Sequence, residues 1–208
     1  MQTYKDILDK YKSDNIKKLI IYRNKINLGL VSNQNKAISL ANGKFIKFIS
    51  GDDIFYSSDA IKSCIEFMKL KDCYVLSTNV EWNDMNMNKL NYSDRFCKKL
   101  MEGNYKIKSG IEKSEVIKLL GVGGVVSSPG VFFSEKVFKF CKFNEDFFLL
   151  DDYPLHHNLL INDKKYEYLN IFTMKYRRGS GVTSIHKDFI IKECRKYFDN
   201  KYIGYSND

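Results

Sequence analysis

Residues 45–56 read FIKFISGDDIFY, an apolar run that stops at two adjacent carboxylates, Asp52 and Asp53. The apolar run predicts a strand. Two acids side by side repel each other, and neither is buried cheaply without a partner. Asp52 and Asp53 are therefore candidate ligand-binding residues at the end of a strand.

The segments around this strand alternate between strand and helix patterns. Residues 17–24 predict a short strand, and residues 28–43 predict a helix that Gly43 closes with a left-handed cap. After the acids, residues 57–69 predict a helix and residues 73–80 a further strand. This order, with short joints, is typical of an α/β domain with a largely parallel sheet. Ligands of such sheets bind beyond the carboxyl ends of the strands, which is where the two acids lie.

The second half of the chain continues in the same way after a long polar stretch. Residues 81–110 are irregular and predict a functional excursion, not a simple connection. Residues 149–162 predict a helix with Pro154 in its first turn. A strand that leads into a basic loop follows at residues 164–181, and a terminal helix at residues 185–202.

The composition is that of one ordinary globular domain. The 208 residues are 44% hydrophobic and 28% charged, which is enough to bury a sizeable core. Apolar runs of the roughly 18 to 20 residues of a membrane span are missing, and Met1 is followed by polar residues in place of a signal core, so the sequence predicts a cytoplasmic protein. The five cysteines form no CxxC pair and predict neither a disulfide framework nor a zinc site.

The formal charge of +9 leaves two interpretations open. It is compatible with a nucleic-acid binder, a membrane surface or a phosphate-bearing ligand. The lysines are dispersed among acids and apolar residues, however, which favours a generally lysine-rich surface and no nucleic-acid partner.

The chemistry of the acid pair suggests a cation. Asp52 and Asp53 at the end of a strand can hold a hard divalent ion, which prefers oxygen ligands and often completes its shell with substrate phosphates. A nucleotide-activated substrate would follow from that. The alternative is that the pair is solvated or caps a helix, as acids in loops usually do.

A longer pattern supports the ligand-binding interpretation. Residues 27–53, NLGLVSNQNKAISLANGKFIKFISGDD, contain Asn27, Gly29, Asn35, an Ala-x-Gly step and the final acids in order. This pattern resembles family-two glycosyltransferases of the GT-A fold. The resemblance implies a Rossmann-like α/β domain over residues 1–208 with a mostly parallel sheet flanked by helices. It also implies Mn²⁺ or Mg²⁺ at Asp53 and Asp52, with Asp52 on the metal or the ribose.

The acids at the start of the later helix fit the same resemblance. The stretch FNEDFFLLDDYPLHHNLL resembles the family's second signature, an acidic pair that opens a helix. Asp152 would then be the base that deprotonates the acceptor hydroxyl, with Asp151 binding substrate beside it. The structural alternative is a helix cap, because an acid at a helix start is stabilised by free N–H groups and the dipole.

Two further pairs of residues are candidates by position. Gly123 and Gly124 lie where the family places its acceptor-facing loop, although a glycine-rich turn without a ligand is the alternative. Arg177 and Arg178 lie after the last strand, where basic side chains reach the diphosphate. The three histidines have no third ligand spaced for a metal, and we expect packing or surface roles for them.

The chain also departs from the family pattern. Ser50 replaces the first acid of the metal motif, and Gln34 replaces the basic residue before Asn35. The Gln-x-x-Arg-Trp motif of processive synthases is missing, which favours transfer of single sugars. The chain is expected to begin roughly 35 residues late and to lack the first strand-helix-strand unit, about half of the donor site.

The resemblance therefore implies a metal-dependent, inverting glycosyltransferase. Its expected donor is a nucleotide-diphosphate sugar, with a UDP-sugar favoured, and its acceptor a saccharide or lipid-linked sugar in bacterial-type surface polysaccharide synthesis. Peripheral contact with the inner face of the membrane belongs to the same expectation. The alternative is a non-catalytic remnant of this fold that acts as a binding or assembly partner, motivated by Ser50, Gln34 and the missing donor half.

Overall fold

The computed structural model describes residues 16–90, 128–179, 181 and 185–202. The described elements, in chain order, are α2 (Gly29–Leu40), β1 (Phe45–Ile46), β2 (Ile54–Phe55), α3 (Ala60–Lys71), β3 (Val75–Asn83), the 3-10 helix η1 (Ser128–Gly130), β4 (Val131–Ser134), α6 (Glu135–Phe140), α7 (Asp152–Ile161), β5 (Tyr166–Arg177) and α9 (Lys187–Tyr202). Gly123 and Gly124 lie outside the described residues.

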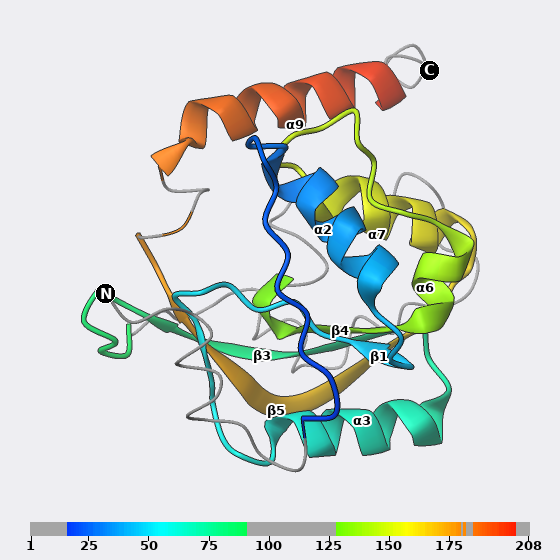
Figure 1. Cartoon of the computed structure of the whole chain (residues 1–208), viewed down its shortest axis with the longest axis vertical. Coiled ribbons are helices and arrows are strands. Elements are labelled where there is room, and N and C mark those ends of the chain that lie inside the picture. Colours follow the sequence, from blue (N-terminus) through cyan, green and yellow to red (C-terminus); the bar gives the residue numbers. More distant parts are fainter. Residues whose placement is uncertain (1–15, 91–127, 180, 182–184, 203–208) are drawn as a thin grey trace.

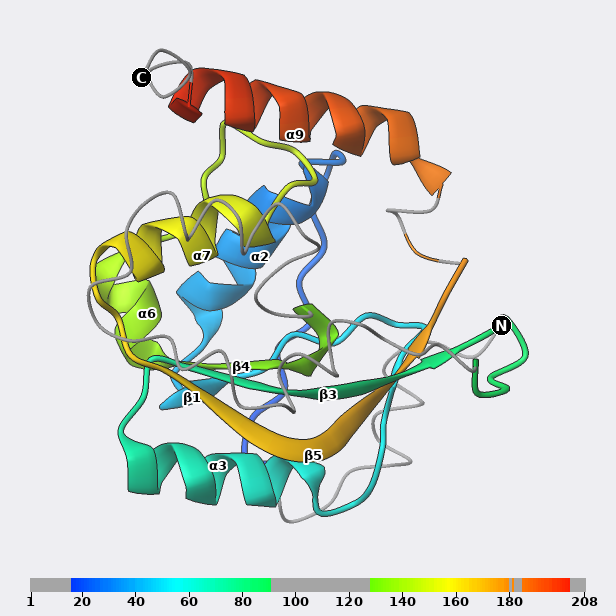
Figure 2. The ribbon, with the colours of Figure 1, turned by 180° about the vertical axis from the view of Figure 1, so that it is seen from behind.

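Helices cover both faces of a central sheet. Figures 1 and 2 show α3 on one face, α2, α6 and α7 on the other, and α9 across the outer side of α2 and α7. The predicted α/β class is therefore confirmed. Within the described ranges, every helix is too short or too polar to cross a lipid bilayer.

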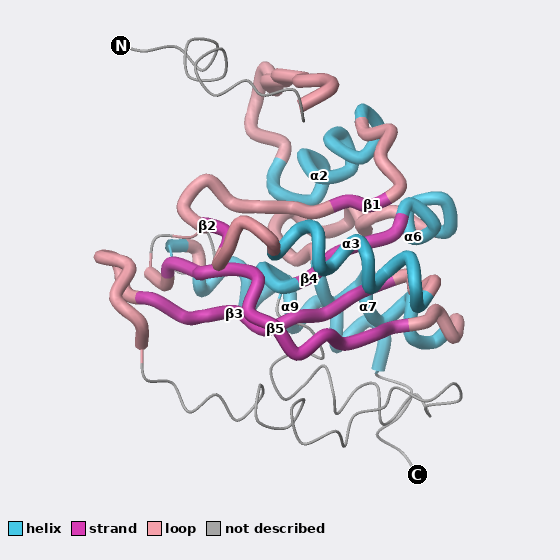
Figure 3. The backbone as a smooth tube through the Cα atoms, turned by 90° about the horizontal axis from the view of Figure 1, so that it is seen from below, coloured by secondary structure: helices cyan, strands magenta, loops and turns pink. Residues whose placement is uncertain are grey.

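The sheet is mixed, not largely parallel as predicted. Its described strands run in the order β1-β4-β3-β5-β2 (Figure 3), and of their pairings only β3 with β5 is parallel. The alternation of strands and helices suggested a largely parallel sheet. Instead β4, which comes far later in the chain, lies antiparallel between β1 and β3 and pairs with both.

The core has two halves because both faces of the sheet are buried. Successive side chains of a strand point to opposite faces. Val75 and Phe133 accordingly belong to the cluster under α2 and α7, whereas Leu76 and Phe132 belong to the cluster against α3. β3 is therefore buried along nearly all of its length, including its polar side chains.

Two local predictions near the start of the described chain are wrong. Residues 17–24 form no strand, and Leu19, Ile20 and Ile21 are 52%, 44% and 60% exposed, because no described strand lies beside them to pair with. The helix α2 ends at Leu40 with an extended C-cap, so Gly43 is not a left-handed cap.

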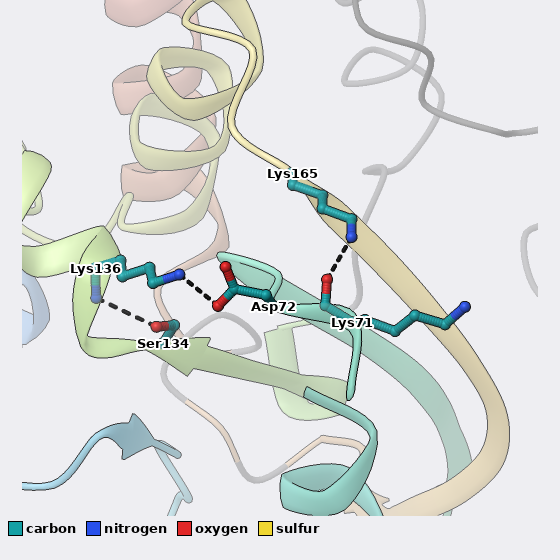
Figure 4. A network of polar contacts seen from close by, with 5 residues as sticks. All are labelled: Lys71, Asp72, Ser134, Lys136 and Lys165. Carbon is teal, nitrogen blue, oxygen red and sulfur yellow. Dashed lines mark hydrogen bonds and ion pairs between the residues drawn. The ribbon is translucent and has the colours of Figure 1, made fainter. Parts of the chain in front are cut away.

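Polar contacts at one end of the sheet join α3 to the start of α6 (Figure 4). Lys136 Nζ lies 2.5 Å from Asp72 Oδ1, and the Lys136 N–H donates to Ser134 Oγ over 3.3 Å. Lys165 Nζ donates to the Lys71 carbonyl. The Lys136 ammonium lowers the pKa of Asp72. Because these contacts are exposed, they contribute little to the free energy of unfolding. They fix the position of the C-terminal end of α3.

Candidate active site

Asp53 lies just before β2, against the end of β5. Its side chain is 8% exposed, and Oδ1 accepts the backbone N–H of Arg177 over 3.1 Å. β2 pairs with β5 through Ile54 and Lys175, which brings the two segments together. The structure thus joins Asp53 and Arg177, two predicted site residues that are 124 positions apart.

The surroundings of Asp53 disfavour its negative charge. Burial raises the pKa of Asp53, and the neighbouring Asp52 adds to that effect, while the Arg177 N–H and the Lys47 ammonium oppose it. A divalent cation would relieve both the burial and the repulsion between the acids. The described residues contain no group of three or more acidic, histidine or cysteine ligands, so two carboxylates, substrate oxygens and water would have to make up a coordination shell. Hard ions such as Mg²⁺ and Mn²⁺ accept that kind of shell, and the residues fit one.

The two arginines after β5 have separate contacts. Arg177 donates from Nε to Met87 Sδ over 3.2 Å. The Arg178 backbone N–H donates to the Asn83 carbonyl over 2.9 Å, and its side chain is exposed. Their predicted contact with a diphosphate stays a prediction.

Asp152 is held by two hydrogen bonds at the start of α7. Its Oδ1 accepts the N–H of Tyr153 over 2.8 Å, and its Oδ2 accepts the hydroxyl of Ser128 over 3.1 Å. Burial raises the pKa of Asp152, while these two donors lower it. The Asp151 side chain makes no capping hydrogen bond, so the cap alternative accounts for only part of this acidic pair.

Asp151 has a hydrogen-bond partner in Gln34, the residue that stands where the family pattern has a basic side chain. The amide of Gln34 on α2 donates from Nε2 to Asp151 Oδ2 over 2.7 Å. Burial, and next the negative charge of Asp152, raise the pKa of Asp151 to about 7. Gln34 is itself buried, and its Oε1 has no hydrogen-bond partner among the described residues. The Gln34 hydrogen bond lowers the pKa of Asp151 and so opposes burial, without the full positive charge that a basic residue would bring.

Replacing Asp151 with Asn tests this state. The pKa of Asp151 is raised when the protein is folded, so folding takes up a proton that the unfolded chain has released. Its contribution to stability is therefore lost as pH rises from about 4 to about 7. We expect Asp151→Asn to gain at least about 1 kcal/mol of unfolding free energy over the parent protein between pH 5 and pH 8.

Urea unfolding of both proteins at the two pH values measures this difference. Asp146→Asn is the matched control, because Asp146 is exposed in the same loop. Equal differences at pH 5 and pH 8 would contradict the raised pKa of Asp151.

The residues of the family pattern in and just before α2 have structural contacts in the described chain. Asn27 Oδ1 accepts the N–H of Gly29 over 3.0 Å, which forms the turn that starts the helix. Asn35 Nδ2 donates to the Phe143 carbonyl over 3.0 Å, and Asn35 Oδ1 accepts the Phe143 N–H over 3.1 Å. These contacts hold the loop before Asp151, so substrate binding by Asn27, Gly29 and Asn35 stays a prediction.

Glu193 on α9 also supports this loop, and the sequence analysis did not single it out. Its carboxylate accepts the N–H groups of Phe148, Leu149 and Leu150 over 2.5, 2.9 and 2.9 Å. Lys196, one turn later, donates to the Asp146 carbonyl over 2.9 Å. The available signal in the sequence was an acid, Glu193, on the otherwise apolar side of the terminal helix. A carboxylate that is buried there needs hydrogen-bond donors from a neighbouring segment.

The histidines of α7 pack, as predicted. His156 Nδ1 shares a hydrogen bond of 2.7 Å with the Tyr166 hydroxyl, and its ring stacks on Phe133. Burial lowers the pKa of His156 to about 4, so it is neutral at pH 7. His157 Nδ1 forms a hydrogen bond with the Tyr197 hydroxyl. Both rings therefore belong to the core.

The fold is shared with solved structures of S. aureus TarS. The chain matches S. aureus TarS in complex with UDP-GlcNAc with a TM-score of 0.58 at 16% identity, over 93% of this chain and 53% of that one. It matches TarS in complex with UDP with a TM-score of 0.56 at 15% identity, over 97% and 60% of the two chains. These similarities confirm the predicted GT-A fold.

The sequence comparisons agree with the fold. An uncharacterized glycosyltransferase of Methanocaldococcus jannaschii is 27% identical over 172 residues, which cover 83% of this chain and 54% of that protein. The chain thus spans about half the length of this relative. The model of the glycosyl transferase family 2 matches residues 2–139. The chain therefore belongs to glycosyltransferase family 2.

Proposed function

We propose that this protein transfers a single sugar from a nucleotide-diphosphate donor to a hydroxyl of a saccharide or lipid-linked acceptor, with inversion of the anomeric centre. The observation that carries the proposal is the acidic pair at the start of α7. Burial and the negative charge of Asp152 favour the protonated form of Asp151, against the Gln34 hydrogen bond, whereas the Ser128 hydroxyl and the Tyr153 N–H favour the carboxylate form of Asp152 against burial. A carboxylate held by two donors, beside an acid whose pKa is raised to about 7, suits general base catalysis.

The proposed reaction assigns one task to each group. The Asp152 carboxylate accepts the proton of the acceptor hydroxyl while that oxygen attacks the anomeric carbon. The bond from that carbon to the diphosphate oxygen breaks, and the electron pair leaves with the diphosphate. Asp53 and Asp52 would hold Mn²⁺ or Mg²⁺, which when bound stabilises the charge of the leaving diphosphate. Arg177 and Arg178 would contact the same diphosphate.

The proposal also covers the donor and the cellular setting of the reaction. The fold matches structures that were solved with UDP-GlcNAc and UDP, which favours a UDP-sugar. Surface polysaccharide synthesis at the cytoplasmic face of a membrane is the proposed setting, and the charge of +9 would favour contact with an anionic lipid surface.

The alternative function is a non-catalytic partner protein of the same family. Ser50 in place of the first metal acid favours it. The contact between Gln34 and Asp151 favours the enzyme, because Gln34, which also departs from the family pattern, is then a hydrogen-bond partner within the acidic site.

The proposal is tested by thermal unfolding with UDP, GDP and their sugars, with and without Mn²⁺. A ligand that binds only the folded state stabilises it, by about 2.7 kcal/mol at a hundred times its dissociation constant. We expect a metal-dependent rise in Tm that Asp53→Ala abolishes. Asp188→Ala, which removes an exposed acid on α9, is the control and should keep the rise.

The opposite result is equally informative. A cooperative transition with no shift under any donor would show that this chain folds without holding donor, and would favour the non-catalytic alternative. A shift that Asp53→Ala leaves intact would contradict the proposed metal ligand.

A further inference from the structure

Lys47 is a half-buried cation to which the proposed reaction assigns no task. It follows β1 directly, and its Nζ donates to the backbone carbonyl of Pro129. The same nitrogen lies 4.9 Å from the centroid of the Phe132 ring. Burial lowers the pKa of Lys47 to about 8, and the negative charge of Asp53 opposes that effect. Partial burial of an ammonium is costly, and the hydrogen bond to Pro129 offsets part of that cost.

The turn that Lys47 contacts carries a residue of the acidic site. Pro129 is the middle residue of η1, whose next residue, Gly130, accepts the Thr78 hydroxyl over 2.7 Å. A Cβ atom on Gly130 would lie 2.5 Å from the Thr78 carbonyl oxygen, so the turn sits directly on β3. The residue before Pro129 is Ser128, the donor to Asp152. Lys47 therefore holds the Pro129–Gly130 peptide of the turn, one residue after Ser128.

We propose that Lys47 is a positioning residue for Asp152: its ammonium fixes the η1 turn through the Pro129 carbonyl, and the fixed turn holds the Ser128 hydroxyl on the Asp152 carboxylate. The inference rests on the proposed function, because Asp152 matters for transfer only as the base. The contact between Lys47 and η1 spans 82 positions of sequence, and that between Ser128 and Asp152 spans 24. One chain of contacts thus connects the end of β1 to the start of α7.

The test measures the Asp152 carboxyl directly, without turnover. The full chain is labelled with ¹³C at the aspartate Cγ, and the Asp152 signal is assigned by its loss in Asp152→Asn. Its titration is followed in the parent protein, Lys47→Met, Ser128→Ala and the double variant. Other titratable groups around this carboxyl are unchanged in all four proteins; they are Asp151 and Tyr153 on α7 and Cys194 on α9.

The expected result is non-additive. A hydrogen bond from Ser128 favours the carboxylate, so its loss in Ser128→Ala should raise the titration midpoint of Asp152 by about one pH unit. Lys47→Met should raise the midpoint by a similar amount in the parent protein and by little in the Ser128→Ala background. That outcome supports positioning through the turn.

Two outcomes would overturn the inference. An equal rise from Lys47→Met in both backgrounds would mean that the lost positive charge acts on Asp152 through space. No rise in either background would mean that the turn holds Ser128 without Lys47. If Lys47→Met lacks a cooperative unfolding transition, Lys47→Gln completes the same comparison.

The measurement also separates this inference from the proposed function. If the titration is non-additive but the protein transfers no sugar, the role of Lys47 stands and the proposed function fails. If the protein transfers sugar but the shifts are additive or absent, the proposed function stands and the role of Lys47 fails.

Discussion

Asp152→Asn is expected to lower kcat for sugar transfer by about a thousandfold, within the range of about 10² to 10⁴ that a general base contributes. Asn has nearly the same shape: its oxygen can still accept the Tyr153 N–H, which Asp152 Oδ1 binds at 2.8 Å, and its NH2 group can donate to Ser128 Oγ, which lies 3.1 Å from Asp152 Oδ2. It cannot take a proton from the acceptor hydroxyl at neutral pH. The measurement is the initial rate of transfer from a saturating nucleotide sugar, with donor binding followed in parallel by the metal-dependent rise in Tm.

Two comparisons make this prediction specific to the base. Donor binding should be nearly unchanged in Asp152→Asn, because the proposed donor contacts lie at Asp53 and beyond β5. Ser128→Ala should keep most of kcat at high pH. As the pH falls, this variant should lose activity at a higher pH than the parent protein, because loss of the Ser128 hydroxyl raises the pKa of Asp152. Undiminished transfer by Asp152→Asn would remove this residue from the mechanism.

Gly29→Ala is expected to be strongly destabilising, by about 3 to 5 kcal/mol of unfolding free energy. Gly29 has φ of +83°, in the left-handed region that side chains disfavour. A Cβ atom there would also lie 2.5 Å from the Phe148 carbonyl oxygen and 2.6 Å from its ring. That carbonyl accepts the N–H of Leu30 over 2.8 Å, so the clash would push the loop away from the start of α2.

Gly51→Ala is the matched control, because a Cβ atom at Gly51 would have no atom within 4 Å and its φ is not left-handed. Urea unfolding of the two variants and the parent protein, with a common m value, compares them. A loss of under about 1 kcal/mol in Gly29→Ala would show that the turn and the Phe148 loop adapt together. A large loss in Gly51→Ala would instead point to a general sensitivity of the loops.

The acidic positions could be found from the sequence because their signals are local. An apolar run that ends in Asp52 and Asp53, and a helix that opens with Asp151 and Asp152, are visible in windows of about ten residues. The helix predicted at residues 57–69 appears as α3 (Ala60–Lys71) for the same reason. The predicted strand at residues 17–24 fails because pairing depends on a neighbour outside its own window.

The sequence by itself determined the alternation of helices and strands, the family pattern and the positions of the two acidic pairs, since each depends on residues close together in the chain. Only the tertiary structure decided what surrounds those acids. Gln34 reaches Asp151 across 117 positions, and Lys47 reaches Pro129 across 82. The Lys47 contact depends on the strand order, in which β4 lies antiparallel between β1 and β3 and brings η1 to the end of β1. Burial in that arrangement is what shifts the pKa values of Asp151 and Asp152, because desolvation arises from distant segments that fold over the site.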